Sequence, residues 1–168
     1  AAYGLDLDER ALTRLARRGS GSASRSVIPG FAVWHAGDTD EESFAESVDA
    51  PALAMVIAIV DAGEKPVSSR AAMRRTVLTS PFYPAWVTST DESLRSALAA
   101  CRDGDVDRLG RIAETNALRM HALIQSCDPP IRYLAPTSLA VLDRIEALRA
   151  RGVGAYATAD AGPNVVVI

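Results

Sequence analysis

Cysteine and histidine are scarce in this sequence, with two of each among 168 residues. The cysteines, Cys101 and Cys127, lie far apart in segments that read as helical, so they make neither a disulfide framework nor a zinc-ligand spacing. We therefore expect no metal site built from them, and a reducing cytoplasm as the location of the chain. The histidines, His35 and His121, lack the Ser/His/Asp spacing that would favour a hydrolase, and we expect both to have packing or surface roles.

Long apolar runs and a strong net charge are also absent. The longest apolar run, Pro51 to Val60, is too short to span a bilayer, and no signal peptide opens the sequence, so we expect no membrane partner. The formal net charge of −3 gives no reason to expect nucleic acid as a partner. With 48% hydrophobic residues, the chain has the composition of an ordinary globular enzyme and the length to bury a sizeable core.

Positive charge is nevertheless concentrated locally. Arg14, Arg17, Arg18 and Arg25 crowd one segment, and three more arginines lie between residues 70 and 75. Without further motifs, the simplest interpretation of both clusters is a solvated helix face.

The periodicity of the apolar residues predicts an α+β fold. Apolar residues at spacings of three and four predict helices, whereas short apolar runs bounded by turn residues predict strands. The expected helices lie at 8–18, 68–79, 92–102, 106–124 and 139–148, and the expected strands at 31–35, 53–60, 155–159 and 165–168. Because 53–60 is almost continuously apolar, we expect that strand to be buried. The result would be a mostly antiparallel sheet covered by helices.

The segment Ser20 to Ser26 is the first candidate site. It alternates small residues with serines directly after a predicted helix, so that backbone N–H groups and the hydroxyls of Ser20 and Ser22 can converge on an anion. Arg25 adds a permanent charge that can grip a carboxylate or phosphate through two hydrogen bonds. Taken alone, a flexible Gly/Ser linker is the simpler interpretation of this segment.

The segment Lys65 to Arg70 is the second candidate. It opens a predicted helix with a cation and the hydroxyls of Ser68 and Ser69, and helix N-termini of this kind bind anions. A plain N-cap beside a solvated Arg70 explains the same residues equally well.

The third candidate is Asp160, in the sequence Asp-Ala-Gly-Pro-Asn between two predicted strands. Such residues are common in turns, so an ordinary hairpin connection is the simpler interpretation. The functional alternative is a rigid turn, fixed at Pro163 and permissive at Gly162, that holds a carboxylate at the end of a strand. There the carboxylate can accept a proton or stabilise positive charge.

These segments and several further residues follow, in order and spacing, the pattern of one known family. The series runs through Gly19–Ser26, Trp34, Asp61 with Lys65, Val67–Arg70, Met73, Thr79–Tyr83, Met120–Ala122, Pro129–Ile131 and Asp160–Asn164. In this series the chain resembles the mevalonate diphosphate decarboxylases of the GHMP kinase superfamily. The resemblance covers nearly the whole chain; each motif is weak alone, and their serial agreement is strong.

The resemblance implies a GHMP-kinase-like, two-lobed α+β fold, of which this chain would be the carboxy-terminal half. Residues from about 1 to 45 would end the first lobe, and residues from about 46 to 168 would form the GHMP C-terminal-type lobe. The implied reaction uses ATP and Mg²⁺ to phosphorylate the tertiary 3-hydroxyl of mevalonate 5-diphosphate. Loss of phosphate and CO₂ then gives isopentenyl diphosphate. The family is commonly dimeric, so we expect a homodimer.

The resemblance also implies roles for particular residues. Asp160 would act beside the 3-hydroxyl, as general base or as stabiliser of a cation-like transition state, and we expect it to be buried. Arg25 would orient the substrate carboxylate. The remaining substrate-binding residues would be Ser20, Ser22, Ser68, Ser69, Arg70 and Met73.

The chain departs from the family in one respect that matters for activity. The superfamily's Gly/Ser-rich loop for the ATP phosphates is absent, and the sequence stops inside the apolar run Val165 to Ile168. We therefore expect a fragment that is inactive alone, with ATP and Mg²⁺ bound mainly by other parts of the parent enzyme. Two alternatives stay open: a phosphomevalonate decarboxylase acting on the monophosphate, and a non-catalytic binding or dimerisation module.

Overall fold

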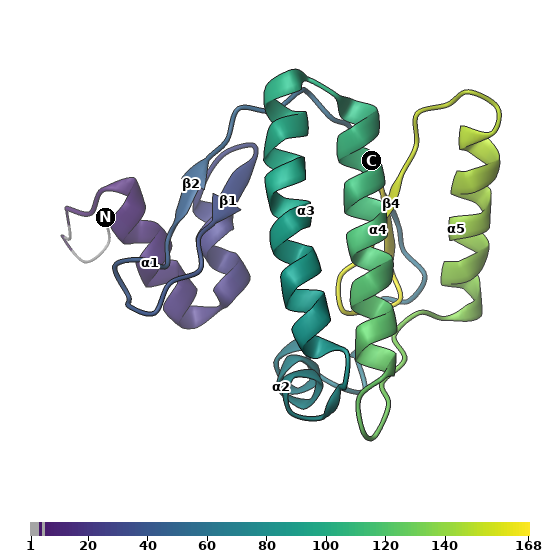
Figure 1. Ribbon diagram of the computed structural model, residues 1–168, viewed down its shortest axis with the longest axis horizontal. Coiled ribbons are helices and arrows are strands. Elements are labelled where there is room, and N and C mark those ends of the chain that lie inside the picture. Colours follow the sequence, from purple (N-terminus) through teal and green to yellow (C-terminus); the bar gives the residue numbers. More distant parts are fainter. Residues whose placement is uncertain (1–3, 5) are drawn as a thin grey trace. The chain divides into compact units, whose positions relative to one another are not determined.

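The chain divides after Ala50 into two units, Ala1–Ala50 and Pro51–Ile168 (Figure 1). The computed structural model describes Gly4 and residues 6–168, and residues 1–3 and 5 lie outside the described residues. Within that part of the chain, helices and antiparallel strands occur together, so the expected α+β class is confirmed.

The first unit contains one helix, a short 3-10 helix and a two-stranded sheet among its described residues. Helix α1 begins where Asp8 accepts a hydrogen bond from the backbone N–H of Ala11 at 2.7 Å, as an N-cap residue does. The bounds are α1 Glu9–Gly19, η1 Gly21–Val27, β1 Ala32–Trp34 and β2 Ala45–Ser47, with β1 and β2 antiparallel. The buried hydroxyl of Thr13 accepts from the backbone N–H of Ala45 at 3.1 Å and so ties α1 to the sheet.

Three arginines of α1 surround one carboxylate. Arg14 and Arg17 each reach Asp40 at 2.5 Å, and Arg18 reaches it at 3.2 Å. Hydrogen bonds from Arg14 and then Arg18 lower the pKa of the Asp40 carboxyl to about 2. The simple interpretation of these arginines as a solvated face is therefore wrong: they are engaged within the unit and not held ready for a ligand.

The second unit is a three-stranded antiparallel sheet with a layer of helices. The elements are β3 Val56–Ala58, α2 Ser69–Thr79, α3 Tyr83–Asp103, α4 Val106–Gln125, α5 Pro136–Arg149, β4 Ala157–Thr158 and β5 Val165–Val167. The strand order is β3-β5-β4, so the last strand lies in the centre. Helices α3, α4 and α5 run alongside one another, and α2 is seen nearly end-on in Figure 1.

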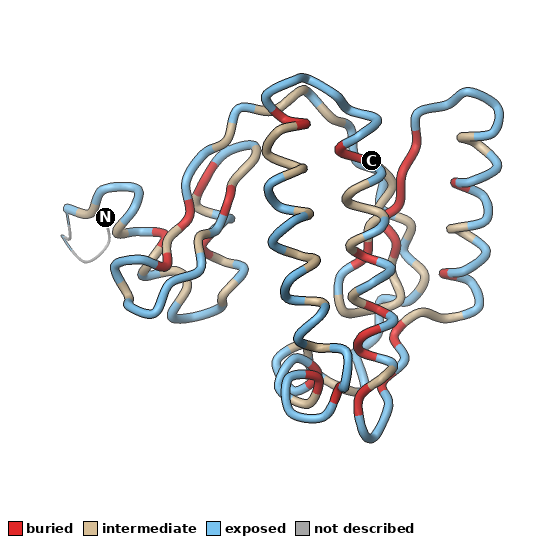
Figure 2. The backbone as a smooth tube through the Cα atoms, in the orientation of Figure 1, coloured by how far each residue is buried: buried red, intermediate tan, exposed pale blue. Residues whose placement is uncertain are grey.

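Helix α4 lies against the sheet and carries much of the core of the second unit. Figure 2 shows buried residues gathered on α4 and on the chain that leads into β4, while α3 and α5 have long exposed stretches. Gly110 lets α4 approach the ring of Tyr156, which is only 2% exposed. One turn further along, the Glu114 carboxylate accepts from the Ala157 N–H at 2.8 Å and from both terminal nitrogens of Arg149. These contacts fix β4, the strand that precedes Asp160.

The expected buried strand at 53–60 is wrong in both length and burial. Only Val56–Ala58 forms a strand, and Val56, Ile57 and Ile59 are 66, 64 and 72% exposed. Among the described strands β3 pairs with β5 alone and is an edge strand. An apolar run indicates what a strand can bury, but it does not indicate whether another layer covers it.

The expected helix at 92–102 is too short. Helix α3 begins at Tyr83, directly after the Ser80–Phe82 break, and ends before Gly104, which adopts a left-handed φ of 68°. Pro84 does not prevent this, because it lies in the first turn, where a missing N–H breaks no hydrogen bond within the helix. The proline-containing segment after α2 is therefore followed directly by a helix and not by a loop.

Candidate functional site

The start of α2 forms a cationic, hydroxyl-rich helix N-terminus. The Ser68 hydroxyl accepts from the Ala71 N–H at 3.2 Å, which identifies Ser68 as the N-cap. The half-buried Ser69 instead accepts a hydrogen bond from the Lys65 ammonium at 3.3 Å, and Arg70 is exposed. The first N–H groups of a helix have no partners within it, so this end offers backbone donors and two cations to an anion.

The turn that carries Asp160 is fixed from several sides. The Asn164 side-chain oxygen accepts from the backbone N–H groups of Val60 and Asp61 at 2.8 and 3.0 Å. The Ser138 hydroxyl, fully buried at the start of α5, donates to the Pro163 carbonyl at 2.5 Å. These hydrogen bonds anchor the hairpin turn between β4 and β5 that carries Asp160.

The Asp160 side chain itself is exposed in this chain, so the expectation that it is buried is wrong. The burial of its neighbours explains why the sequence suggested burial for Asp160 as well. Ala159 is 8% exposed and Val165 is fully buried, so the strands on either side enter the core while the turn between them reaches the surface.

The structure brings the start of α2 and the Asp160 turn together. A Cβ atom on Gly162 would lie 3.8 Å from the Lys65 Cε, so the lysine chain passes close to the turn. Ala161 packs on the same apolar cluster as Val67, the residue before the N-cap, and this cluster also holds Ala72, Ile124, Cys127, Ile131 and Tyr133. Residues about 90 positions apart thus share one surface of the second unit.

Met73 lies one helical turn beyond Ser69, and its side chain is 60% exposed. Met73 is therefore a surface residue near the start of α2, and its predicted role in contacting substrate stays a prediction.

Lys65 is a further residue of this surface, in addition to the substrate-binding residues expected from the sequence. The sequence places it only in the cationic segment before α2. Its contacts with Ser69 and with the neighbourhood of Gly162 make it the cation between the two parts of the site. Its place four residues before Ser69 gave a local signal, whereas its proximity to residue 162 required the fold.

In the first unit, Ser20, Ser22 and Arg25 lie on one short ordered segment. The hydroxyls of Ser20 and Ser22 are 3.4 Å apart, and the fully buried Ser24 donates to the Gly21 carbonyl at 2.9 Å. The simple interpretation of a flexible linker is therefore wrong, because Ser22 and Arg25 lie in the 3-10 helix η1 and Ser20 is the residue directly before it. Arg25 is exposed and forms no ion pair within the described part of the chain.

The glycine in this segment has a steric reason. A Cβ atom on Gly21 would lie 2.8 Å from the Trp34 ring, so glycine allows η1 to pack closely against that tryptophan. Trp34 in turn donates from its indole nitrogen to the Ser43 hydroxyl at 3.1 Å. The conformation of the Ser20–Arg25 segment is thus set by contacts inside the first unit.

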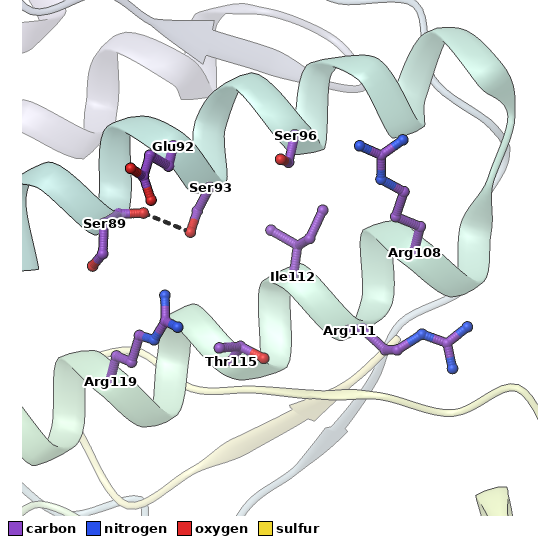
Figure 3. A pocket seen from close by; sticks show the side chains of 9 residues that line it. All are labelled: Ser89, Glu92, Ser93, Ser96, Arg108, Arg111, Ile112, Thr115 and Arg119. Atoms are coloured by element: carbon purple, nitrogen blue, oxygen red, sulfur yellow. Dashed lines mark hydrogen bonds between the residues drawn. The ribbon is translucent and has the colours of Figure 1, made fainter.

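A hollow of about 380 Å³ lies elsewhere, between α3 and α4 (Figure 3). Arg108, Arg111 and Arg119 line one side of it, but none of the predicted site residues does. On the other side, the Ser93 hydroxyl donates to the Ser89 carbonyl at 2.7 Å, within α3. The shape and donors of this hollow give no reason to move the candidate site away from Asp160.

The described residues contain neither a metal-binding cluster nor a membrane-spanning helix. No three His, Cys, Asp or Glu side chains there are arranged to hold a metal ion. Likewise, none of the helices described combines the length and apolarity needed to cross a bilayer.

Comparison with known proteins decides the family. Residues 55–168 match the family model described as mevalonate 5-diphosphate decarboxylase C-terminal domain. The chain belongs to the mevalonate 5-diphosphate decarboxylase family. Residues 1–45 match a second model, the diphosphomevalonate decarboxylase-like N-terminal domain. The resemblance inferred from the ordered motifs is therefore confirmed.

Individual decarboxylases of this family match nearly the whole chain. The diphosphomevalonate decarboxylases of Ganoderma lucidum and Bos taurus are 33 and 34% identical to it, over 99 and 98% of the chain. These matches cover 45 and 43% of the relatives' own lengths. The chain thus spans a little under half the length of the curated relatives it matches.

Solved structures of decarboxylases agree in fold. The mevalonate diphosphate decarboxylases of Enterococcus faecalis and Staphylococcus aureus are 44 and 43% identical, each with a TM-score of 0.91. They cover 98 and 96% of this chain, which covers 50% of each of theirs. A related structure described as "MDDEF in complex with MVAPP, AMPPCP and Magnesium" is 46% identical, with a TM-score of 0.93 over 98% of this chain and 51% of that one.

Proposed function

We propose that the enzyme to which this chain contributes decarboxylates mevalonate 5-diphosphate, using ATP, to isopentenyl diphosphate, ADP, phosphate and CO₂. The observation that carries the proposal is the shared surface of the second unit, where the cationic start of α2 meets the anchored Asp160 turn. Membership of the decarboxylase family supplies the reaction for which this pairing of an anion site with a carboxylate is suited.

The substrate carries two anionic groups, and the proposal assigns each to a set of residues. Ser68, Ser69 and Arg70 bind the diphosphate, because backbone donors at a helix start and an arginine complement several phosphate oxygens. Lys65 adds charge on the side nearest Asp160, and Met73 contacts the carbon skeleton of the substrate. Anchoring the diphosphate in this way fixes the reacting end of the molecule and lowers the entropy cost of the reaction.

Arg25 takes the substrate carboxylate in this proposal, with the Ser20 and Ser22 hydroxyls as further donors. Its guanidinium has no competing ion pair within the described residues, unlike Arg14, Arg17 and Arg18. Holding the carboxylate in place directs the C–C bond that breaks when CO₂ leaves.

Asp160 is the catalytic residue of the proposal and acts at the substrate's 3-hydroxyl. As a general base it accepts the hydroxyl proton while the oxygen gains a phosphoryl group. As an anion it also stabilises positive charge that develops at the 3-carbon when phosphate departs. The electrons of the breaking bond to CO₂ then form the double bond of the product.

The residues of this chain do not fit ATP or Mg²⁺. The sequence has no glycine-rich phosphate loop of the superfamily type, and the described residues contain no group of three or more His, Cys, Asp or Glu side chains that could hold a metal ion. We therefore assign ATP and Mg²⁺ to parts of the enzyme outside this chain, and derive no step through them.

The proposal extends to the organisation of the enzyme. We assign residues from about 1 to 45 to the end of the first lobe and residues from about 46 to 168 to the C-terminal-type lobe, in a cytoplasmic homodimer. The N-terminal and C-terminal family models, which match residues 1–45 and 55–168, support the lobe assignment. Sedimentation of the full-length protein tests the dimer.

A coupled ADP-release assay on the full-length enzyme tests the proposed substrate. We expect kcat/KM for mevalonate 5-diphosphate to exceed that for the 5-monophosphate by at least about 10-fold, because the second phosphate adds charge-assisted hydrogen bonds of about 1.5–3 kcal/mol each. A preference for the monophosphate would identify a phosphomevalonate decarboxylase instead. Absence of ADP release with both would favour a non-catalytic module.

A further inference from the structure

His121 is a buried polar residue that the proposed chemistry does not use. It lies on α4 and is 3% exposed, and its Nε2 atom is buried with no hydrogen-bond partner among the described residues. A buried nitrogen without a partner costs free energy, so its retention calls for an explanation. From the sequence we expected a packing or surface role, and the burial selects packing.

The ring lies beside the backbone that leads to Asp160. Burial lowers the pKa of His121, and backbone groups of Ala159 and Asp160 oppose that change without giving Nε2 a well-formed hydrogen bond. His121 and Ala159 also line the same small pocket, of about 10 Å³, which is close to the minimum for one water molecule. The imidazole therefore borders the start of the Asp160 turn.

The imidazole also lies near Tyr133, which is hydrogen-bonded to the segment before α2. Tyr133 meets the imidazole edge-on, with ring centroids 6.5 Å apart at 86°. The Tyr133 hydroxyl donates to the Val67 carbonyl at 2.9 Å, immediately before the N-cap Ser68. A chain of contacts thus runs from Asp160 through His121 and Tyr133 to the start of α2.

We propose that His121 is a positioning residue, whose imidazole ring braces the Ala159–Asp160 backbone against Tyr133 and so sets the place of Asp160 relative to the start of α2. The proposal rests on the proposed function for its catalytic consequence. The brace is built from the second unit alone and needs no ligand. An apolar side chain fills the space but keeps neither the shape nor the polarity of the imidazole beside the turn.

The first test is kinetic and uses the full-length enzyme. We expect His121→Leu to lower kcat by about 10-fold with less than about a 3-fold change in KM for mevalonate 5-diphosphate, because misplacing a catalytic group affects the transition state more than binding. His121→Gln keeps a polar nitrogen near Nε2. Its decrease in log kcat should be at most about half of the decrease in His121→Leu. His35→Leu, at a partly exposed histidine of the first unit paired with Glu46 at 2.9 Å, is the control and should leave kcat unchanged.

A double-mutant cycle separates positioning from general loss of structure. In the Asp160→Asn background, His121→Leu should lower the remaining kcat by less than about 2-fold, because the residue it positions has already lost its function. An undiminished 10-fold effect in that background would overturn the proposal.

Hydrogen exchange provides a readout that does not depend on activity. In His121→Leu, the amides of the 159–164 segment should exchange at least about 5-fold faster, while those of α5 keep the wild-type rate. If wild-type protein has no decarboxylase activity, the proposed function fails, and the exchange result still decides whether the brace exists. Unchanged exchange in this segment would overturn the brace whatever the kinetics show.

Discussion

Asp160→Asn in the full-length enzyme is expected to lower turnover by about 100-fold or more while substrate still binds, as for the loss of a catalytic acid or base. The amide keeps the shape of the side chain and leaves the anchored turn intact, since the bonds to Asn164 and Pro163 do not involve the carboxylate. It cannot, however, take the proton of the 3-hydroxyl or supply a negative charge.

Steady-state ADP release and calorimetric titration with mevalonate 5-diphosphate measure the two quantities separately. Asp143→Asn, at an exposed position on α5, is the matched control and should keep wild-type values of both. Turnover within a few-fold of wild type in Asp160→Asn would show that the carboxylate is only a residue of the turn.

Gly110→Ala is expected to destabilise the full-length protein by about 3 kcal/mol, at the upper end of the cost of overpacking a core. A Cβ atom there would lie 2.1 Å from Cδ2 and 2.4 Å from Cγ of Tyr156. The Tyr156 ring cannot move away easily, because its hydroxyl donates to Asp107 at 2.9 Å. The backbone N–H and carbonyl of Tyr156 are also both hydrogen-bonded to Ile168. At an exposed position in a helix interior the same substitution would stabilise the protein by about 1 kcal/mol. The sign of the change in the free energy of unfolding therefore tests the close packing by itself.

Denaturant unfolding followed by circular dichroism measures this effect. Gly154→Ala serves as the control, because its Cβ atom would meet only the Asp107 carboxylate, at an ordinary 3.7 Å. The control should change the free energy of unfolding by less than about 0.5 kcal/mol. A Gly110→Ala protein as stable as wild type would mean that α4 and Tyr156 are not packed as closely as described.

Local signals allowed much of the second unit to be predicted from the sequence. The cap at Ser68 or Ser69, the helix expected at 106–124 and the Asp160–Asn164 turn between two strands depend on residues near one another in the chain; the structure has the cap at Ser68 and the helix at Val106–Gln125. Capping, helical periodicity and turn preference each act over a few residues, which is why these predictions are confirmed.

The features that the sequence did not reveal depend on distant contacts. The Asp40 carboxylate forms ion pairs with arginines more than 20 positions away. The 53–60 run contributes an edge strand, because β5 pairs with β3 on one side and occupies the centre of the described sheet. The approach of Lys65 to Gly162, and of His121 to the Asp160 turn, likewise required the fold. For the site as a whole, sequence motifs suggested the residues, and the structure brought together only those of the second unit.

The central claim is that this chain supplies the carboxylate and anion sites of an enzyme that decarboxylates mevalonate 5-diphosphate. The most direct test is to quantify CO₂, ADP and isopentenyl diphosphate formed by the full-length enzyme from mevalonate 5-diphosphate and ATP. We expect the three products in equal amounts, with all three reduced together in Asp160→Asn. ADP without CO₂ would identify a kinase and contradict the claim.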